Sequence, residues 1–210
     1  HHAARPGLGA LPHSPGQDMN YGQLKAAMTA YTHRSDAAAM ADVFMPIAEQ
    51  RIYFGESNSP AVRLSSMLST VTLATGTRPA GFVEAKKVFE LSRPECPLEF
   101  RPMEFMDREC RKFSWDGETL VLSRDMSFPM QMTYYGQLAT PVADADTNPI
   151  LTKFPNVYLT SILVEFARWA RDDEMLVREA GNYASAVSSA QSADQRAQHS
   201  GSMLVMRTRP

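Results

Sequence analysis

Residues 154–187 carry the pattern that most restricts the fold, two helical segments joined by an acidic turn. Pro155 favours a helix start, because proline lacks the amide hydrogen that a first helical turn leaves unbonded. Asp172 and Asp173 are typical caps of a second helix, where their charges meet the helix dipole. Helices joined this tightly must pack as an antiparallel hairpin. The positions that mark the two helices recur every three or four residues, and they are Phe154, Val157, Tyr158, Ile162, Glu165, Phe166, Trp169, Leu176, Tyr183 and Val187.

Two shorter helices are predicted near the N-terminus, on either side of an interruption at residues 32–36. Asn20 with Gln23 three residues later forms a capping pair that opens the first helix. Ser35 or Asp36 caps the second helix, and Pro46 within it is expected to kink it or divide it in two. The apolar positions are Tyr21, Leu24, Met28 and Tyr31 in the first helix and Met40, Val43, Phe44, Ile47 and Ile52 in the second.

Between about residues 64 and 140 the apolar period changes toward two, which indicates strands. Asp116-Gly117 is a strong hairpin signal, because glycine supplies the positive φ of a tight turn. We expect a short helical turn over residues 102–108 and a polar loop over residues 141–153. The strand candidates are residues 70–75, whose alternation is imperfect, and residues 82–91, 111–115, 119–123 and 130–135.

The sequence thus predicts an α+β fold, mostly α with a β-rich insert. A small helical bundle is closed by the C-terminal helical hairpin, with antiparallel strands in the middle and an extended C-terminal arm. Residues 1–18 are rich in Pro, Gly and His, so we interpret them as a flexible leader or an expression tag before a natural start at Met19. The folded domain is predicted over residues 19–193 and the arm over residues 194–210.

The arm ends in four apolar residues followed by arginines. A segment this short does not fold alone, and we hypothesise that it adds a strand to the sheet of another chain while its arginines meet acidic groups. An unstructured end, or a strand added to the chain's own sheet, is the alternative. The predicted partner-binding residues are Met203, Leu204, Val205, Met206, Arg207 and Arg209.

Composition narrows the class of protein. With 210 residues, of which 44% are hydrophobic and 21% charged, the chain fits one globular domain with extensions. A net charge of −2 argues against a general nucleic-acid binder, which carries a basic excess. Cys96 and Cys110 do not make a disulfide framework, so both are expected to be reduced thiols. No apolar run approaches the roughly 20 residues that span a bilayer, and we expect no membrane partner.

Local signatures of catalysis are missing from the sequence, which has no Gly-rich phosphate loop and no nucleophile elbow. His33 is expected to face solvent or cap a helix, since no second ligand lies at metal-binding spacing from it. The acidic pairs Asp144 with Asp146 and Asp172 with Asp173 are interpreted as loop and helix-start residues, not metal ligands. We therefore expect no enzyme activity, no cofactor and no metal.

The order of these elements resembles the head-to-tail adaptor, or connector, proteins of tailed phages. The clearest segment is residues 155–187, which is similar to that family's tyrosine-leucine helix start, acidic turn and second helix with a central tyrosine. The segments that carry the resemblance cover most of residues 20–190, and they are YGQLKAAMTAYTHRSD at 21–36, FMPIAEQRI at 44–52, QMTYYGQL at 131–138 and PNVYLTSILVEFARWARDDEMLVREAGNYASAV at 155–187.

The resemblance implies a structural virion protein of the phage neck, assembled in the host cytoplasm. Such a protein forms a ring, commonly of twelve copies, between the portal protein and the tail or the next neck protein. The C-terminal arm would reach into the portal, and the middle strands would line the tail side or a neighbouring subunit. DNA would pass through the channel without specific binding, which suits the mildly acidic composition.

Three other interpretations compete with this one. The chain is alternatively another neck or tail-completion protein, which sequence alone separates poorly from an adaptor. A small hydrolase or lyase would show a deep pocket with several perturbed titratable groups. A non-viral helical interaction module would remain a monomer or dimer whatever portal is added.

Overall fold

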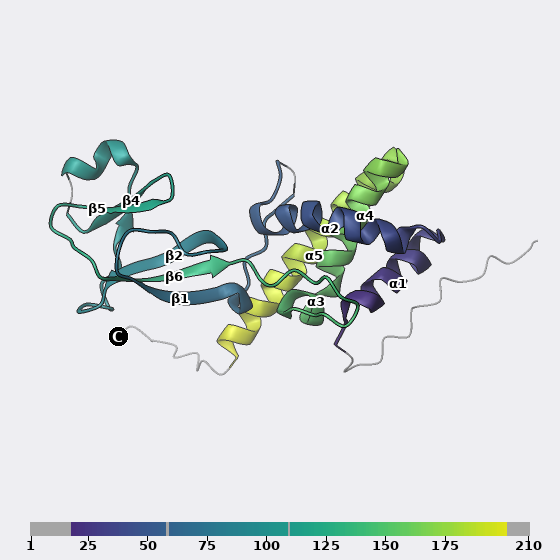
Figure 1. The fold of residues 1–210 in the computed structure, drawn as a ribbon, viewed down its shortest axis with the longest axis horizontal. Coiled ribbons are helices and arrows are strands. Elements are labelled where there is room, and N and C mark those ends of the chain that lie inside the picture. The colour runs from purple at the N-terminus through teal and green to yellow at the C-terminus, as the bar shows by residue number, and fades with distance from the viewer. Residues whose placement is uncertain (1–17, 58, 109, 201–210) are drawn as a thin grey trace, which may run out of the picture.

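The helices gather in one body and the strands form a lobe beside it, which gives the molecule an elongated outline (Figure 1). The computed structural model describes residues 18–57, 59–108 and 110–200. Within them, the mixed α+β class predicted from the sequence is confirmed. The helices are α1 (Tyr21–Thr32), α2 (Ala37–Phe54), α3 (Pro149–Lys153), α4 (Pro155–Ala170) and α5 (Asp173–His199). The strands are β1 (Leu68–Leu73), β2 (Phe82–Glu90), β3 (Glu99–Phe100), β4 (Lys112–Asp116), β5 (Thr119–Leu122) and β6 (Met130–Gly136).

α4 is the central helix of the body, because it packs against α1, α2, α3 and α5. The predicted antiparallel hairpin of α4 and α5 is present, and Asp172 caps α5 by accepting the amide hydrogen of Met175 at 2.9 Å. The predicted capping box of α1 is confirmed as well. Asn20 Oδ1 accepts the Gln23 amide hydrogen at 2.9 Å, and Gln23 Oε1 accepts that of Asn20 at 3.0 Å.

The β lobe contains two three-stranded sheets. The first has the order β1-β6-β2 and is antiparallel throughout, with two register shifts in β2. In the second, β4 and β5 form the hairpin predicted at Asp116-Gly117, where Gly117 has a φ of 56°, and the short β3 runs parallel to β4. A core shared by both sheets consists of Leu73, Val88, Leu98, Phe113, Leu120, Met130 and Met132.

The β lobe contacts the helical body through the segment that precedes β1. The connection from α2 buries Val62 and Leu64 in the core of the helical body. From the other side, Asp194 of α5 accepts the amide hydrogen of Ser65 at 2.8 Å and its hydroxyl hydrogen, and Gln191 donates to the carbonyl of Ala61 at 3.1 Å. The end of α5 therefore holds the segment that leads into the first sheet.

The structure corrects the extent of two predicted elements. Of the two outcomes expected at Pro46, division of the helix is wrong, because α2 is one helix through Pro46. Pro46 is exposed, as is Asp42, whose carbonyl loses its helical partner there. Water can bond a carbonyl on the solvent side of a helix, so the proline does not divide α2. The polar loop predicted over residues 141–153 contains α3, because Asn148 caps it with two hydrogen bonds and Pro149 suits its first turn.

The predicted start of the arm at residue 194 falls inside α5, which continues to His199. Alanine and glutamine favour helix strongly in this stretch, and the contacts of Gln191 and Asp194 hold it against the start of β1. Residues 194–199 are therefore helical and not part of an extended arm. Residues 201–210 lie outside the described residues.

The apolar face of α2 also differs from the predicted one. Val43 and Ile47 were among the apolar positions that marked the predicted helix, and their side chains are 59% and 44% exposed. The buried side of α2 includes small residues, which allow neighbouring helices to approach closely. The buried hydrophobic residues of α2 are Ala37, Ala41, Phe44, Met45, Ala48, Ile52 and Tyr53.

Two glycines differ in the space around them, which provides a matched test of the close packing between Gly76 and Leu120 in the β lobe. A Cβ atom at Gly76 would lie 2.5 Å from the carbonyl oxygen of Leu120, whereas one at Gly181 in α5 meets no heavy atom within 4 Å. We predict that Gly76→Ala lowers the free energy of unfolding by about 1–3 kcal/mol. Gly181→Ala is expected to raise it by about 0.5–1 kcal/mol, because alanine favours helix. Urea unfolding followed by circular dichroism measures both effects. A Gly76→Ala variant with an unchanged free energy of unfolding would contradict the close packing at Gly76.

Candidate interaction surfaces

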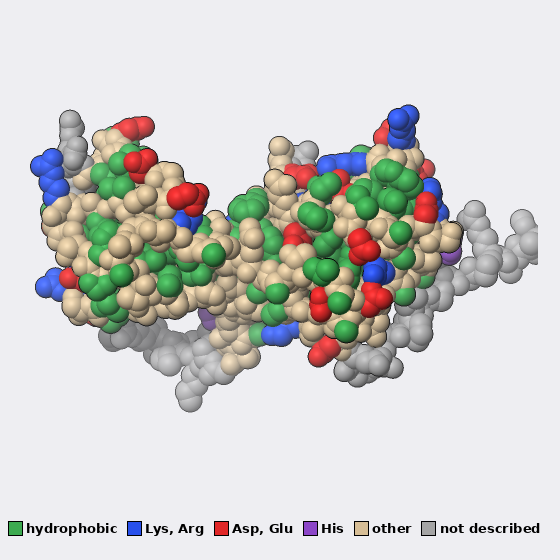
Figure 2. All heavy atoms as spheres, in the orientation of Figure 1, with side chains coloured by type: hydrophobic (Ala, Val, Ile, Leu, Met, Phe, Trp, Pro, Cys, Tyr) green, Lys and Arg blue, Asp and Glu red, His purple; other side chains and the backbone are tan. Residues whose placement is uncertain are grey.

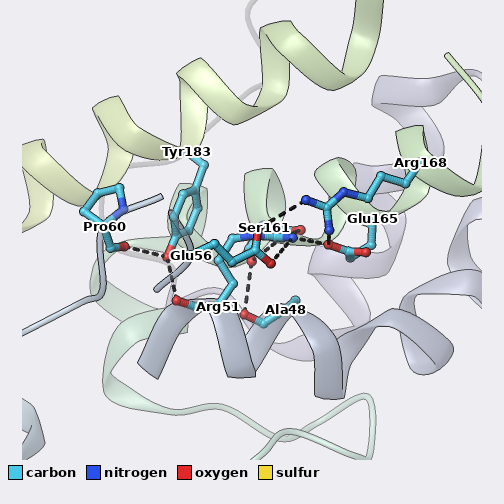
Figure 3. Close-up of polar contacts among 8 residues, drawn as sticks. All are labelled: Ala48, Arg51, Glu56, Pro60, Ser161, Glu165, Arg168 and Tyr183. Carbon is cyan, nitrogen blue, oxygen red and sulfur yellow. Dashed lines mark hydrogen bonds and ion pairs between the residues drawn. The ribbon is translucent and has the colours of Figure 1, made fainter. Parts of the chain in front are cut away.

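A buried arginine organises the centre of the helical body (Figure 3). Arg51 of α2 is 1% exposed, and its Nη1 donates to the carbonyl of Ser161 in α4 at 2.9 Å. Its Nη2 donates to the carboxylates of Glu165 in α4 and of Glu56, the latter at 3.0 Å. A buried charge is tolerated only when it is paired and hydrogen-bonded in this way.

Arg168 closes the network on its solvent side. It donates to Glu165 at 3.0 Å and to Glu56 at 3.1 Å, so two arginines and two carboxylates alternate. Burial by itself raises the pKa of Glu56, but the hydrogen bonds and charges of Arg51 and Arg168 hold that pKa below its ordinary value. Both carboxylates are committed to arginines, which gives the network a structural role and leaves neither as a free base.

α5 joins the same network through Tyr183, which is fully buried. Its hydroxyl donates to the carbonyl of Pro60 at 3.2 Å and lies 3.4 Å from the carbonyl of Arg51. Figure 3 shows Tyr183 reaching from α5 toward α2. The network therefore fixes three helices and the turn after α2 relative to one another.

A second buried network centres on Glu49 of α2. Its carboxylate accepts the hydroxyl hydrogens of Tyr158, at 2.9 Å, and of Thr140. Asn148 donates to the Tyr158 hydroxyl at 2.8 Å, which ties the cap of α3 to α4. Burial raises the pKa of Glu49 above its ordinary value, and the bonds from Thr140 and Tyr158 only partly oppose that rise. Burial likewise raises the pKa of Tyr53 beside it to about 12.

The polar residues singled out in the sequence have structural partners. His33 is exposed and ends α1 with a φ of 54°, as expected of a capping residue. Asp144 forms an ion pair with Lys25, and Asp146 accepts the amide hydrogens of two residues in its own loop. Within residues 18–57, 59–108 and 110–200, no three His, Cys, Asp or Glu residues gather as a metal site, and no helix is long and apolar enough to cross a membrane.

The six predicted partner-binding residues lie outside the described residues. They are Met203, Leu204, Val205, Met206, Arg207 and Arg209. Cys96 and Cys110 are exposed free thiols. The candidate site is therefore sought on the surface of the described part of the chain.

One candidate surface is a groove between α4 and α5 of about 650 Å³, called here the α4–α5 groove. Leu159 and Leu163 of α4 and Ala186 and Ala190 of α5 are among its apolar residues. Polar side chains are also present, including Asn182 and others that come from both helices. An apolar floor with polar side chains around it is typical of a protein-binding surface.

A second candidate is the solvent face of α2, called here the α2 stripe. Val43, Ile47 and Phe54 are 59%, 44% and 55% exposed, and Ala39 and Pro46 are exposed on the same side. These positions fall within one third of the helix circumference, at 100° per residue. A helix that is apolar on two faces is normally covered on both.

The third candidate is on the β lobe, where hydrophobic side chains also gather on the face seen in Figure 2. Phe100, Met103 and Phe105 follow one another closely in the chain and are 53%, 44% and 52% exposed. The large exposed side chains of the described residues thus lie on both the body and the lobe. Surfaces of this kind mark sites of protein association.

The comparison with known proteins agrees with an assembly component. Residues 19–207 match the SU10 adaptor protein family, which covers nearly the whole chain. The chain belongs to this family. SU10 adaptor proteins are phage head–tail adaptors, so the adaptor is a structural phage protein and the resemblance read from the sequence is confirmed. A search of curated proteins found no match to the chain.

The adaptor's buried ionic network was missed by the sequence analysis. Glu165 stood among the apolar positions of the predicted helix, and a carboxylate on such a face signals a buried partner. Arg51 gave no comparable signal, because it lay between predicted apolar positions where an exposed arginine is ordinary. Only the close packing of α2 on α4 brings the two side chains together.

We predict that Arg51→Met destabilises the adaptor by about 3 kcal/mol, because Glu165 is then left buried with a weaker partner. Arg101→Met is the matched control, since the Arg101 pair with Glu99 is 40% and 56% exposed, and it should change stability by less than about 1 kcal/mol. The double variant Arg51→Met with Glu165→Met should be more stable than Arg51→Met alone. Chemical denaturation measures all three, and equal effects of the two single variants would contradict the network's role.

Glu49 should give the adaptor a measurable pH dependence. Because the folded-state pKa is raised, the contribution of Glu49 to stability is fully present below the ordinary glutamate pKa of about 4.3 and is lost as pH rises through the raised value. Glutamine does not titrate. The free energy of unfolding of the natural chain, relative to Glu49→Gln, should therefore fall as pH rises above the ordinary glutamate pKa of about 4.3. Parallel stability curves for the two proteins would disprove this assignment.

Proposed function

We propose that this adaptor forms a dodecameric ring between portal and tail, where it completes the head and provides the tail attachment site. Membership of a phage head–tail adaptor family supports a place in the neck. The observation that carries the ring is the exposure of two separate apolar surfaces on the helical body, the α2 stripe and the α4–α5 groove. A protein that buries neither alone has a reason to associate with copies of itself.

The arm and the β lobe are proposed to meet different partners. The apolar and basic residues Met203–Val205, Met206, Arg207 and Arg209 suit an arm that adds a strand to the portal. The exposed Phe100, Met103 and Phe105 suit contact with the tail or the next neck protein. The net charge of −2 supports a channel that DNA crosses without being held.

Electron microscopy of portal-bearing particles mixed with the purified adaptor tests this proposal. The expected result is a collar of added density at one vertex, with the tail attaching only after the collar has formed. Particles that never bind the adaptor would overturn the proposal. A collar that binds on the far side of another neck protein would identify the chain as a later tail-completion protein.

Removal of residues 201–210 tests the arm. The described core residues of the helical body extend only to Ala190, and Asp194 is the last described contact of α5 with the lobe. We therefore predict that the truncated chain keeps its helical content and unfolding temperature within a few degrees, while its attachment to portal-bearing particles is abolished. Circular dichroism and particle sedimentation measure the two effects.

The matched control for the truncation replaces only Arg207 and Arg209 by serine. This variant keeps the length of the arm and should weaken attachment in a salt-dependent way, because charge pairs between exposed groups are screened by salt. Unimpaired attachment of the truncated chain would show that the portal contact lies elsewhere on the adaptor.

A further inference from the structure

The α2 stripe is a surface without a partner in the described chain. α2 has 18 residues, and the exposed ones are apolar except Asp42 and Gln50. Val43, Ile47 and Phe54 extend from its first turns to its last residue. The stripe, from Ala39 to Phe54, is therefore about 22 Å long at 1.5 Å per residue, comparable to a helix-in-groove contact.

The α4–α5 groove has a similar length. Its α5 side extends from Glu179 to Arg196, which is about 26 Å along a helix. Small residues such as Ala186, Ser189 and Ala193 line that side, and small side chains let another helix approach closely. Leu159 and Leu163 supply apolar contacts from α4. The groove is thus shaped to receive the apolar ridge of one helix.

The stripe and the groove lie on opposite sides of α4. Ser161 and Glu165 face α2, because both bond Arg51. Leu159 and Leu163, which line the groove, each come two positions earlier in the same helix. Two positions correspond to about 200° around a helix at 100° per residue. One copy of the chain therefore cannot fill its own groove with its own stripe.

We propose that the α2 stripe of one copy docks in the α4–α5 groove of the next copy. The two surfaces differ and point in opposite directions, so the contact is head-to-tail and generates a ring when the rotation closes. Charge favours one direction of the contact. Asp42 beside the stripe is exposed, although it also accepts the Tyr21 hydroxyl hydrogen at 2.7 Å and lies 3.8 Å from Lys25. Lys153 and Arg196 line one end of the groove, so the first half of α2 lies toward that end. This interface rests on the ring proposed above and specifies how the ring is built.

Two pairs of matched variants test the interface. Val43→Glu places a charge in the stripe, and Val177→Glu places the same charge at an α5 valine that is 74% exposed and outside the groove. Ser189→Arg obstructs the groove, and Ser188→Arg adds the same side chain at the neighbouring exposed position, which does not line it. All four residues are exposed, so none of these variants should impair folding.

Sedimentation velocity over a concentration series is the first measurement. Val43→Glu and Ser189→Arg should each weaken self-association about tenfold or more, whereas Val177→Glu and Ser188→Arg should associate like the natural chain. An equimolar mixture of Val43→Glu and Ser189→Arg should form dimers and no larger species. In that dimer the intact stripe of the groove variant meets the intact groove of the stripe variant.

Each other outcome is decisive as well. Variants that associate like the natural chain, or a mixture that stays monomeric while the natural chain assembles, would overturn the interface. If the natural chain is monomeric at every concentration, the variants are compared as collars on portal-bearing particles, where a complete collar of Val43→Glu or Ser189→Arg would overturn it. Absence of a collar with the natural chain would instead overturn the proposed function, so the two failures are distinguishable.

Discussion

The buried guanidinium of Arg51 is the interaction on which the arrangement of the helical body depends. It reaches from α2 to a backbone carbonyl and a carboxylate of α4 and to the turn that leads to the β lobe. Apolar packing alone is tolerant of small shifts, whereas hydrogen bonds depend on both distance and direction. The bonds of Arg51 to Ser161 and Glu165 therefore restrict how α2 can lie on α4. The α2 stripe follows from that choice, since it decides which side of α2 remains outside.

The same helix shows why an assembly protein differs from a monomeric one of equal size. The buried side of α2 combines small residues such as Ala41 and Ala48 with large ones such as Phe44 and Ile52. Three further large apolar residues, Val43, Ile47 and Phe54, are exposed. A monomeric protein gains no stability from them, because hydrophobic stabilisation requires burial. Their distribution is consistent with a family of structural adaptors whose partners complete the burial.

Much of the fold could be predicted from the sequence because it is encoded locally. The capping box at Asn20, the Asp116-Gly117 hairpin and the acidic turn before α5 each involve residues a few positions apart. The face of α2 could not be predicted, because both of its sides are apolar and only tertiary packing selects one. The same limit applied to Arg51 and to α3, whose short pattern lies in a polar stretch and is stabilised by Asn148 and its distant partner Tyr158. Local sequence patterns thus predicted the helices and strands. The candidate surfaces depend on how these elements pack against one another, which the sequence did not reveal.

The attachment of α5 to the start of β1 has a mechanical consequence. α5 has 27 residues and runs from the hairpin turn at Asp172 to the bonds that Gln191 and Asp194 make with Ala61 and Ser65. It is one continuous helix, so a load applied at its C-terminal end reaches the segment that leads into β1 before it reaches the core residue Ala190. The helix acts as a strut that carries load between the β lobe and the helical body.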